Sequence, residues 1–152
     1  MKSIKLMLLV LTTCVIAFSS CSKKKGPQPG VIAGMSFKFN GALKSTPTVV
    51  ATYYASVNTL QVVGAISNSE NISLQVDSVK VGTFSAAKAG VILSYSPDAT
   101  FQNTYFGTTG SVTIATYTKT TVTGTFSFTA VNSLNVSATI SAGTFAAQIV
   151  SM

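Results

Sequence analysis

Apolar and polar residues alternate with a period of two through most of the chain beyond residue 35. Met35, Phe37 and Phe39 alternate with Ser36 and Lys38. Successive side chains of a strand point to opposite faces of a sheet, so this pattern predicts strands with one buried and one solvated face. No window keeps the three-four spacing of an amphipathic helix over three turns, so we predict an all-β domain over residues 35–152. The alternation recurs over residues 49–53, 60–66, 72–76, 112–114, 122–128, 136–140 and 145–149.

These segments predict about eight or nine strands, which we expect to form a two-sheet antiparallel β-sandwich, with a partly closed β-barrel as the alternative. Residues 64–84 and 124–145 resemble each other, since each begins with Gly, contains an alternating stretch and ends in Gly-Thr-Phe. We interpret them as two similar meander halves packed face to face. Chance similarity in a chain rich in Thr and Ser is the competing interpretation.

The first twenty residues have the organisation of an export signal. Lys2 and Lys5 supply a positive start, and residues 6–18 are nearly all apolar. A membrane-spanning helix needs about 20 apolar residues, so this shorter run predicts a signal peptide over residues 1–20.

The leader closes with Phe18-Ser19-Ser20-Cys21, which resembles a lipobox. The resemblance implies transfer of diacylglycerol to the Cys21 sulfur, cleavage before Cys21 and acylation of the freed amine by a fatty acid such as palmitate. Phe18 stands where that motif usually has Leu, and Ala17-x-Ser19 also fits an ordinary signal cleavage site. A soluble secreted protein is therefore the alternative to a lipid-anchored one.

Residues 21–34 are predicted to be the lipidated cysteine followed by a flexible tether. Three lysines and two prolines without an apolar face predict an extended, solvated spacer over residues 22–30. Beside a lipid anchor, these lysines could bind anionic headgroups, at about 1 kcal/mol each, and a merely soluble linker is the equal alternative. Some Bacteroidota lipoproteins carry an acidic run here that directs them to the cell surface. We expect an outer-membrane anchor and leave open whether the domain faces the periplasm or the surface.

Composition restricts the chemistry of the predicted domain. The net charge of the whole chain is +7, but the part beyond residue 35 contains five lysines and three carboxylate side chains. The chain has no Arg. We therefore expect no nucleic-acid partner. The chain has no His, and both cysteines precede the domain. Because two usual catalytic residue types are missing, we predict no enzyme activity, no metal site and no cofactor; a Ser-Lys dyad is the weak alternative.

Residues 95–107 interrupt the alternation and hold four aromatic side chains. Aromatic faces beside hydrogen-bonding groups suit a sugar ring or a protein partner, so we predict a ligand site at Tyr95, Asp98, Phe101 and Tyr105. The competing interpretation is that Tyr95, Phe101 and Phe106 fold back and plug one end of the core.

Asp77-Ser78-Val79 matches the acceptor pattern of periplasmic O-glycosylation in Bacteroidota. The match predicts a glycan on Ser78.

Most of the stretch from residue 35 to residue 149 resembles an uncharacterised domain of small Bacteroidota lipoproteins. The resemblance rests on the tyrosine-rich loop followed by segments 110–114, 122–128 and 143–145. It implies an all-β fold and a cell-envelope location, and no mechanism. Together these patterns predict a lipid-anchored cell-envelope module with a non-catalytic binding or accessory role, whose partner is a glycan or an envelope protein. A structural or adhesin-like β module, adding its strands to others, is the alternative.

Overall fold

The computed structural model describes residues 32–152. The predicted signal peptide, the predicted lipidation of Cys21 and most of the predicted tether lie outside these residues. Among the described residues, no helix has the length and apolar character needed to cross a membrane. One 3-10 turn, Phe101–Asn103, accompanies ten strands: β1 (Gly34–Phe39), β2 (Ala42–Thr46), β3 (Val49–Tyr54), β4 (Thr59–Ala65), β5 (Asn71–Asp77), β6 (Gly82–Ser85), β7 (Val91–Ser96), β8 (Tyr105–Tyr117), β9 (Thr121–Val131) and β10 (Ser137–Ser151).

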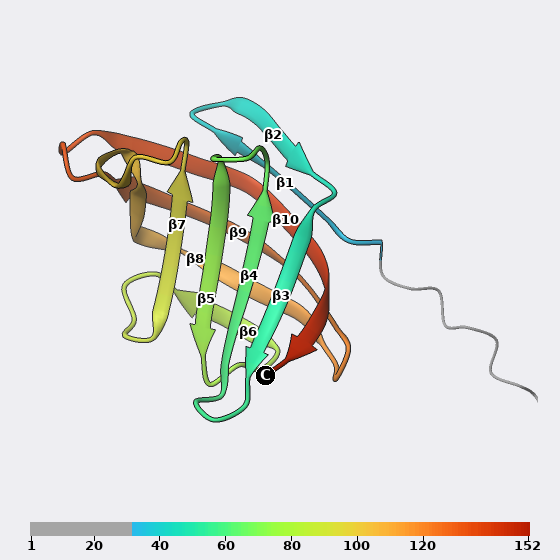
Figure 1. Ribbon diagram of the computed structural model, residues 1–152. Helices are drawn as coiled ribbons and strands as arrows, with labels where there is room; N and C mark the ends of the chain where they lie inside the picture. The colour runs from blue at the N-terminus through green and yellow to red at the C-terminus, as the bar shows by residue number, and fades with distance from the viewer. Residues whose placement is uncertain (1–31) are drawn as a thin grey trace, which may run out of the picture. The chain divides into compact units, whose positions relative to one another are not determined.

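Seven of these strands, β3, β4, β5, β7, β8, β9 and β10, pair in a ring and form a closed barrel (Figure 1). Six of the ring's pairings are antiparallel, and β10 closes it by pairing in parallel with β3, from Ile149↔Ala51 to Ser151↔Tyr53. The all-β prediction is confirmed. The prediction of a two-sheet sandwich is wrong, and the structure matches the alternative prediction of a β-barrel.

The length of β10 explains why a barrel forms. This strand has 15 residues, and one edge pairs with β9 over most of that length. Its other edge pairs first with β1 and then with β3. Because one strand bridges the two ends of the curved sheet, the sheet closes on itself and cannot divide into two layers.

The predicted meander halves do not occupy equivalent places. Residues 64–84 hold the end of β4, all of β5 and most of β6, whereas residues 124–145 hold most of β9 and the first part of β10. Thr83 of the first Gly-Thr-Phe lies in β6 and pairs with Thr113 of β8. Thr144 of the last one lies inside β10, between Thr125 of β9 and Ser36 of β1. The local likeness of the two segments therefore does not reflect two packed halves.

The β1–β2 hairpin packs over one end of the barrel. Its turn is Asn40-Gly41, with φ of 48° and 87°, the left-handed pair that a two-residue hairpin turn requires. The hairpin places Phe37 against the rings of Tyr95 and Phe126, from β7 and β9, with centroids 5.8 and 6.0 Å apart. These contacts bury Phe37 completely and close that end of the core.

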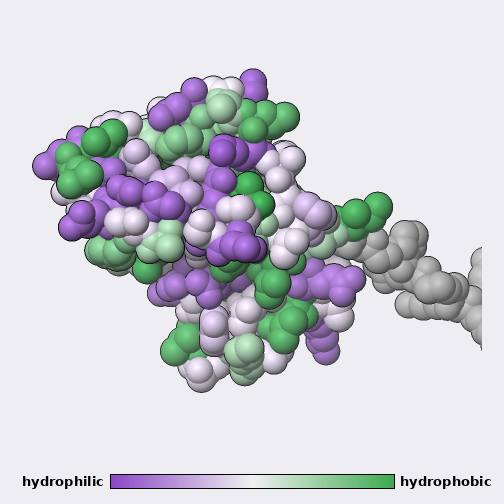
Figure 2. Space-filling model, turned by 45° about the horizontal axis from the view of Figure 1, so that its top comes forward, coloured by the Kyte–Doolittle hydropathy of each residue, from purple (hydrophilic) through white to green (hydrophobic). Residues whose placement is uncertain are grey.

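Alternation along β9 shows how the barrel sorts its side chains. Val122, Phe126, Phe128 and Ala130 are buried in the core. Gly124 is buried with them, and the residues that alternate with these five are Thr or Ser on the outer face, a combination that suits a curved, half-solvated sheet. On the face drawn in Figure 2, apolar side chains form separate patches among polar ones.

Candidate functional site

Tyr95, the first predicted ligand-binding residue, lies inside the barrel. It is only 1% exposed, and its ring packs against Phe37 and Phe39. Its hydroxyl donates a 2.6 Å hydrogen bond to Oε1 of Glu70, which also pairs with Lys44. Burial and the neighbouring Glu70 carboxylate raise the pKa of the Tyr95 hydroxyl. Tyr95 therefore offers no free aromatic face to a ligand.

Tyr105 is half-buried and lies beside Tyr95. The two tyrosines are direct partners in the short pairing of β7 with β8. The ring of Tyr105 lies 5.6 Å from that of Phe39 and 6.4 Å from that of Tyr95. Tyr95, Phe39 and Tyr105 thus form one aromatic cluster at this end of the core.

Asp98 organises the loop between β7 and β8. Its Oδ1 accepts a 2.7 Å hydrogen bond from the Thr100 amide, and its Oδ2 accepts a 2.8 Å hydrogen bond from Nδ2 of Asn103. The bond from Asn103, and to a smaller extent the bond from Thr100, hold the pKa of the Asp98 carboxyl below its ordinary value. The carboxylate is therefore committed to the turn that carries Phe101. Within residues 32–152, no group of three or more His, Cys, Asp or Glu side chains could hold a metal ion.

Phe101 and Phe106 face solvent, with exposures of 73% and 42%. Their rings contact each other, with centroids 6.0 Å apart and planes tilted by 56°. The interpretation that aromatic residues of this segment plug one end of the core is therefore right for Tyr95 and wrong for Phe101 and Phe106. Of the four predicted site residues, the loop brings only Phe101 and Asp98 to the outer surface.

A second loop, residues 132–136, extends this exposed surface. Ser133 Oγ donates a 3.0 Å hydrogen bond to the Gln102 carbonyl, which ties the two loops together. Asn132 Oδ1 accepts bonds from the amides of Leu134 and Val136 and shapes the second loop. We call the exposed apolar residues of these two loops and of the start of β8 the rim patch: Phe101, Phe106, Leu134 and Val136.

Sequence reasoning missed Leu134 and misplaced Val136. The alternation of Val136 with Ala138 and Ile140 predicts a core position, but β10 begins at Ser137 and Val136 lies exposed before it. The usable signal was the stretch Asn132-Ser-Leu-Asn135, where an apolar residue lies between turn-forming ones.

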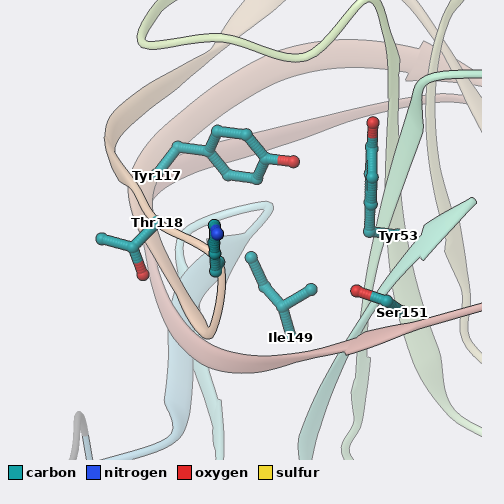
Figure 3. Close-up of a pocket in the computed structure, with 6 residues that line it drawn as sticks. Tyr53, Tyr117, Thr118, Ile149 and Ser151 are labelled. Carbon is teal, nitrogen blue, oxygen red and sulfur yellow. The ribbon is translucent and has the colours of Figure 1, made fainter. Parts of the chain in front are cut away.

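A hollow at the other end of the barrel was not predicted. It has a volume of about 460 Å³ and lies where β3, the β8–β9 turn and β10 meet (Figures 1 and 3). Tyr53 and Tyr117 both line it and pack against each other edge to face, with centroids 6.3 Å apart and planes at 65°. Burial, and to a smaller extent the charge of the nearby Tyr53, raises the pKa of the Tyr117 hydroxyl. We call this feature the tyrosine hollow; it is lined by Tyr53, Tyr117, Thr118, Lys119, Ile149 and Ser151.

Ser78, the predicted glycosylation site, lies exposed between β5 and β6. Its backbone has a φ of 55°, and its amide donates a 2.8 Å hydrogen bond to the Asn58 carbonyl. The neighbouring Asp77 accepts a 2.7 Å hydrogen bond from Thr59 Oγ1. The Ser78 side chain is accessible from solvent, and its modification stays a prediction.

The fold and these surfaces define a small all-β domain: a seven-stranded barrel with an apolar rim at one end and an aromatic hollow at the other. The chain belongs to the family described as a domain of unknown function (DUF6252), whose sequence profile matches residues 32–147. The matched residues include the whole rim patch and end just before Ile149 and Ser151 of the tyrosine hollow. Neither the curated proteins nor the solved structures contain a match.

Proposed function

We propose that this protein is a lipid-anchored module of the cell envelope of a Bacteroidota species, with a non-catalytic binding or accessory role. The anchor rests on the signal-like leader and on the lipobox-like residues before Cys21. The binding role rests on one observation in the described domain, the rim patch.

The rim patch has the properties of a protein contact. Phe101 and Phe106 expose two rings side by side, although burying such a ring fully is worth about 1.5–3 kcal/mol. The hydrogen bonds of Asp98 and Ser133 hold the two loops in place, so little conformational entropy remains to be lost on binding. Clustered, preorganised aromatic residues dominate the energetics of many protein interfaces.

An envelope protein fits this rim better than a glycan does. Tyr95 and Tyr105, whose rings and hydroxyls would suit a sugar, turn toward the core. The four side chains of the rim patch itself are apolar and carry no hydrogen-bonding group. We therefore propose a protein partner, with the rim patch inserted into an apolar depression on its surface.

Site-specific photo-crosslinking in cells tests this role. A photoreactive side chain at Phe101 should give one discrete crosslinked species, and the second-site change Phe106→Ala should remove it. The same side chain at Val57, an exposed apolar position in the β3–β4 turn, is the control and should give none. Equal crosslinking from both positions, or persistence in Phe106→Ala, would contradict a specific partner at the rim.

The anchor and the location need a separate test. An antibody against the domain decides the location in cells that carry the parent protein. Labelling of intact cells would place the domain at the surface, and labelling only of permeabilised cells would place it in the periplasm. In Cys21→Ser the protein should leave the membrane fraction, because one or more acyl chains hold it there. Unchanged membrane association in Cys21→Ser would refute the lipid anchor and favour a soluble secreted protein. An intact mass equal to that of the lipidated polypeptide alone would likewise refute the glycan on Ser78.

The structural alternative has its own support in the unpaired edges of β2 and β6. Within residues 32–152, β2 pairs only with β1, and β6 pairs only with β8. Pairing alternates along β2, so the amides of Leu43 and Ser45 point away from β1 and could bind another strand. Leu43→Pro removes one outward donor and should abolish strand-mediated assembly without unfolding the barrel.

A further inference from the structure

The tyrosine hollow has the size and lining of a small-molecule site, and it is separate from the rim patch. Its volume of about 460 Å³ lies within the range of about 300–1,000 Å³ that is usual for ligand pockets. We propose that it binds an acidic sugar, that is, a pyranose ring that carries a carboxylate. Three features of its lining support this class of ligand.

The first feature is an apolar wall and floor. Figure 3 shows Tyr117 directing its hydroxyl toward Tyr53, with Ile149 below and between them. The two rings pack edge to face, and both line the hollow together with Ile149. Aromatic and aliphatic surfaces of this kind pack against the C–H face of a sugar ring, which a purely polar site cannot do.

The second feature is a set of hydroxyl groups around that wall. The Tyr53 hydroxyl donates a 3.1 Å hydrogen bond to Asn58 Oδ1, and this bond fixes the orientation of the Tyr53 ring. Within residues 32–152, the hydroxyls of Tyr117 and Ser151 have no protein hydrogen-bond partner, so both are free to bind a ligand. A hydroxyl both donates and accepts, so this lining matches the hydroxyls of a sugar.

The third feature is charge. Lys119 lines the hollow, and none of the three carboxylate side chains of the domain does. The ion pair found within residues 32–152 joins Lys44 to Glu70, so the Lys119 ammonium has no side-chain carboxylate partner there. A ligand with one anionic group would supply that partner, and its charge-assisted hydrogen bond is stronger than a neutral one.

Binding of uronic acid oligomers to the purified full-length protein in detergent tests the proposal. Trimers of galacturonic, glucuronic and mannuronic acid are titrated calorimetrically, together with the methyl ester of each, which keeps the rings and removes the charge. At least one acid trimer should bind, and its ester should bind about tenfold more weakly, which corresponds to about 1.4 kcal/mol.

Matched variants locate the site. Lys119→Gln should weaken acid binding about tenfold and remove the preference over the ester, while Lys88→Gln, which changes the net charge equally in the β6–β7 turn, should have no effect. Tyr117→Ala should abolish binding, whereas Tyr54→Ala, the neighbour of Tyr53 in β3, should not. Circular dichroism melting curves show that each variant is folded.

Several outcomes would overturn the proposal. These are the absence of binding to all three acid trimers, equal binding of acid and ester, and equal weakening by Lys88→Gln and Lys119→Gln. Phe101→Ala should leave sugar binding unchanged, because the rim patch lies at the other end of the barrel. A failure at the hollow is therefore distinguishable from a failure of the proposed protein partner.

Discussion

The Tyr95 hydroxyl donates a 2.6 Å hydrogen bond to Oε1 of Glu70, and the same oxygen lies 2.9 Å from Nζ of Lys44. The three residues come from β7, from the residue just before β5 and from β2. The bonds therefore fasten the β1–β2 hairpin to the rim of the barrel, directly above the aromatic cluster of Phe39, Tyr95 and Tyr105.

Removing the Tyr95 hydroxyl should loosen this attachment. Tyr95→Phe keeps the buried ring and deletes a donor to a charged acceptor, so we expect a loss of about 1–2 kcal/mol in the free energy of unfolding. Urea titration of parent and variant measures it. Because Glu70 keeps its pair with Lys44, the barrel should stay folded; a loss below about 0.3 kcal/mol would show that water replaces the hydroxyl without cost.

Acid should weaken the same attachment. Burial raises the pKa of Glu70, but the hydrogen bonds from Tyr95 and Lys44 and the charge of Lys44 outweigh it and lower the pKa below 4.5. A carboxyl with a depressed folded-state pKa stabilises the fold fully above its unfolded value, and this stability is lost as the pH falls through the folded value. Stability should therefore fall below pH 4.5.

The variant Glu70→Gln isolates that effect. The amide oxygen still accepts the bond from Tyr95, but the side chain no longer titrates. The free energy of unfolding should be lower than that of the parent at pH 7 and should fall less steeply between about pH 4.5 and pH 3. An identical pH slope in both proteins would show that another carboxyl controls acid stability.

The sequence predicts most strands of this barrel and fails at its closure. Alternation reports which face of a strand is buried, and it does so correctly for β9, from Val122 to Ala130. It carries no information on which edges pair. The parallel seam of β10 with β3 joins Ile149 to Ala51 across most of the chain, and no local pattern predicts such a pairing.

The candidate sites were harder to predict for a related reason. Tyr95 and Phe101 belong to one aromatic-rich segment, and only the pairing of β7 with β8 turns the first inward and leaves the second exposed. The tyrosine hollow combines Tyr53, Lys119 and Ser151, which are far apart in the chain and meet only when the barrel closes.

Close packing at Gly124 should make the barrel intolerant of a side chain there. A Cβ at Gly124 would lie 2.2 Å from the Thr113 carbonyl oxygen and 2.5 Å from the Phe145 ring. Gly124→Ala must therefore push β8 from β9 or displace a core ring, and we expect a loss of about 3 kcal/mol or more. Gly34→Ala is the control, because its nearest contact would be an ordinary 3.8 Å. Thermal melting of both variants tests this, and equal melting temperatures would contradict the tight approach.

The loop that carries Phe101 should lose its order when Asp98 is removed, while the barrel should not. Asp98→Ala deletes the acceptors of the Thr100 amide and of the Asn103 side chain, and both bonds lie within the loop. Amide hydrogen exchange at Thr100 should accelerate at least tenfold, whereas exchange in β9 should not change. If the rim patch binds a partner because it is preorganised, the crosslink from Phe101 should weaken in the same variant. Faster exchange with an undiminished crosslink would mean that the exposed rings, and not their fixed placement, determine binding.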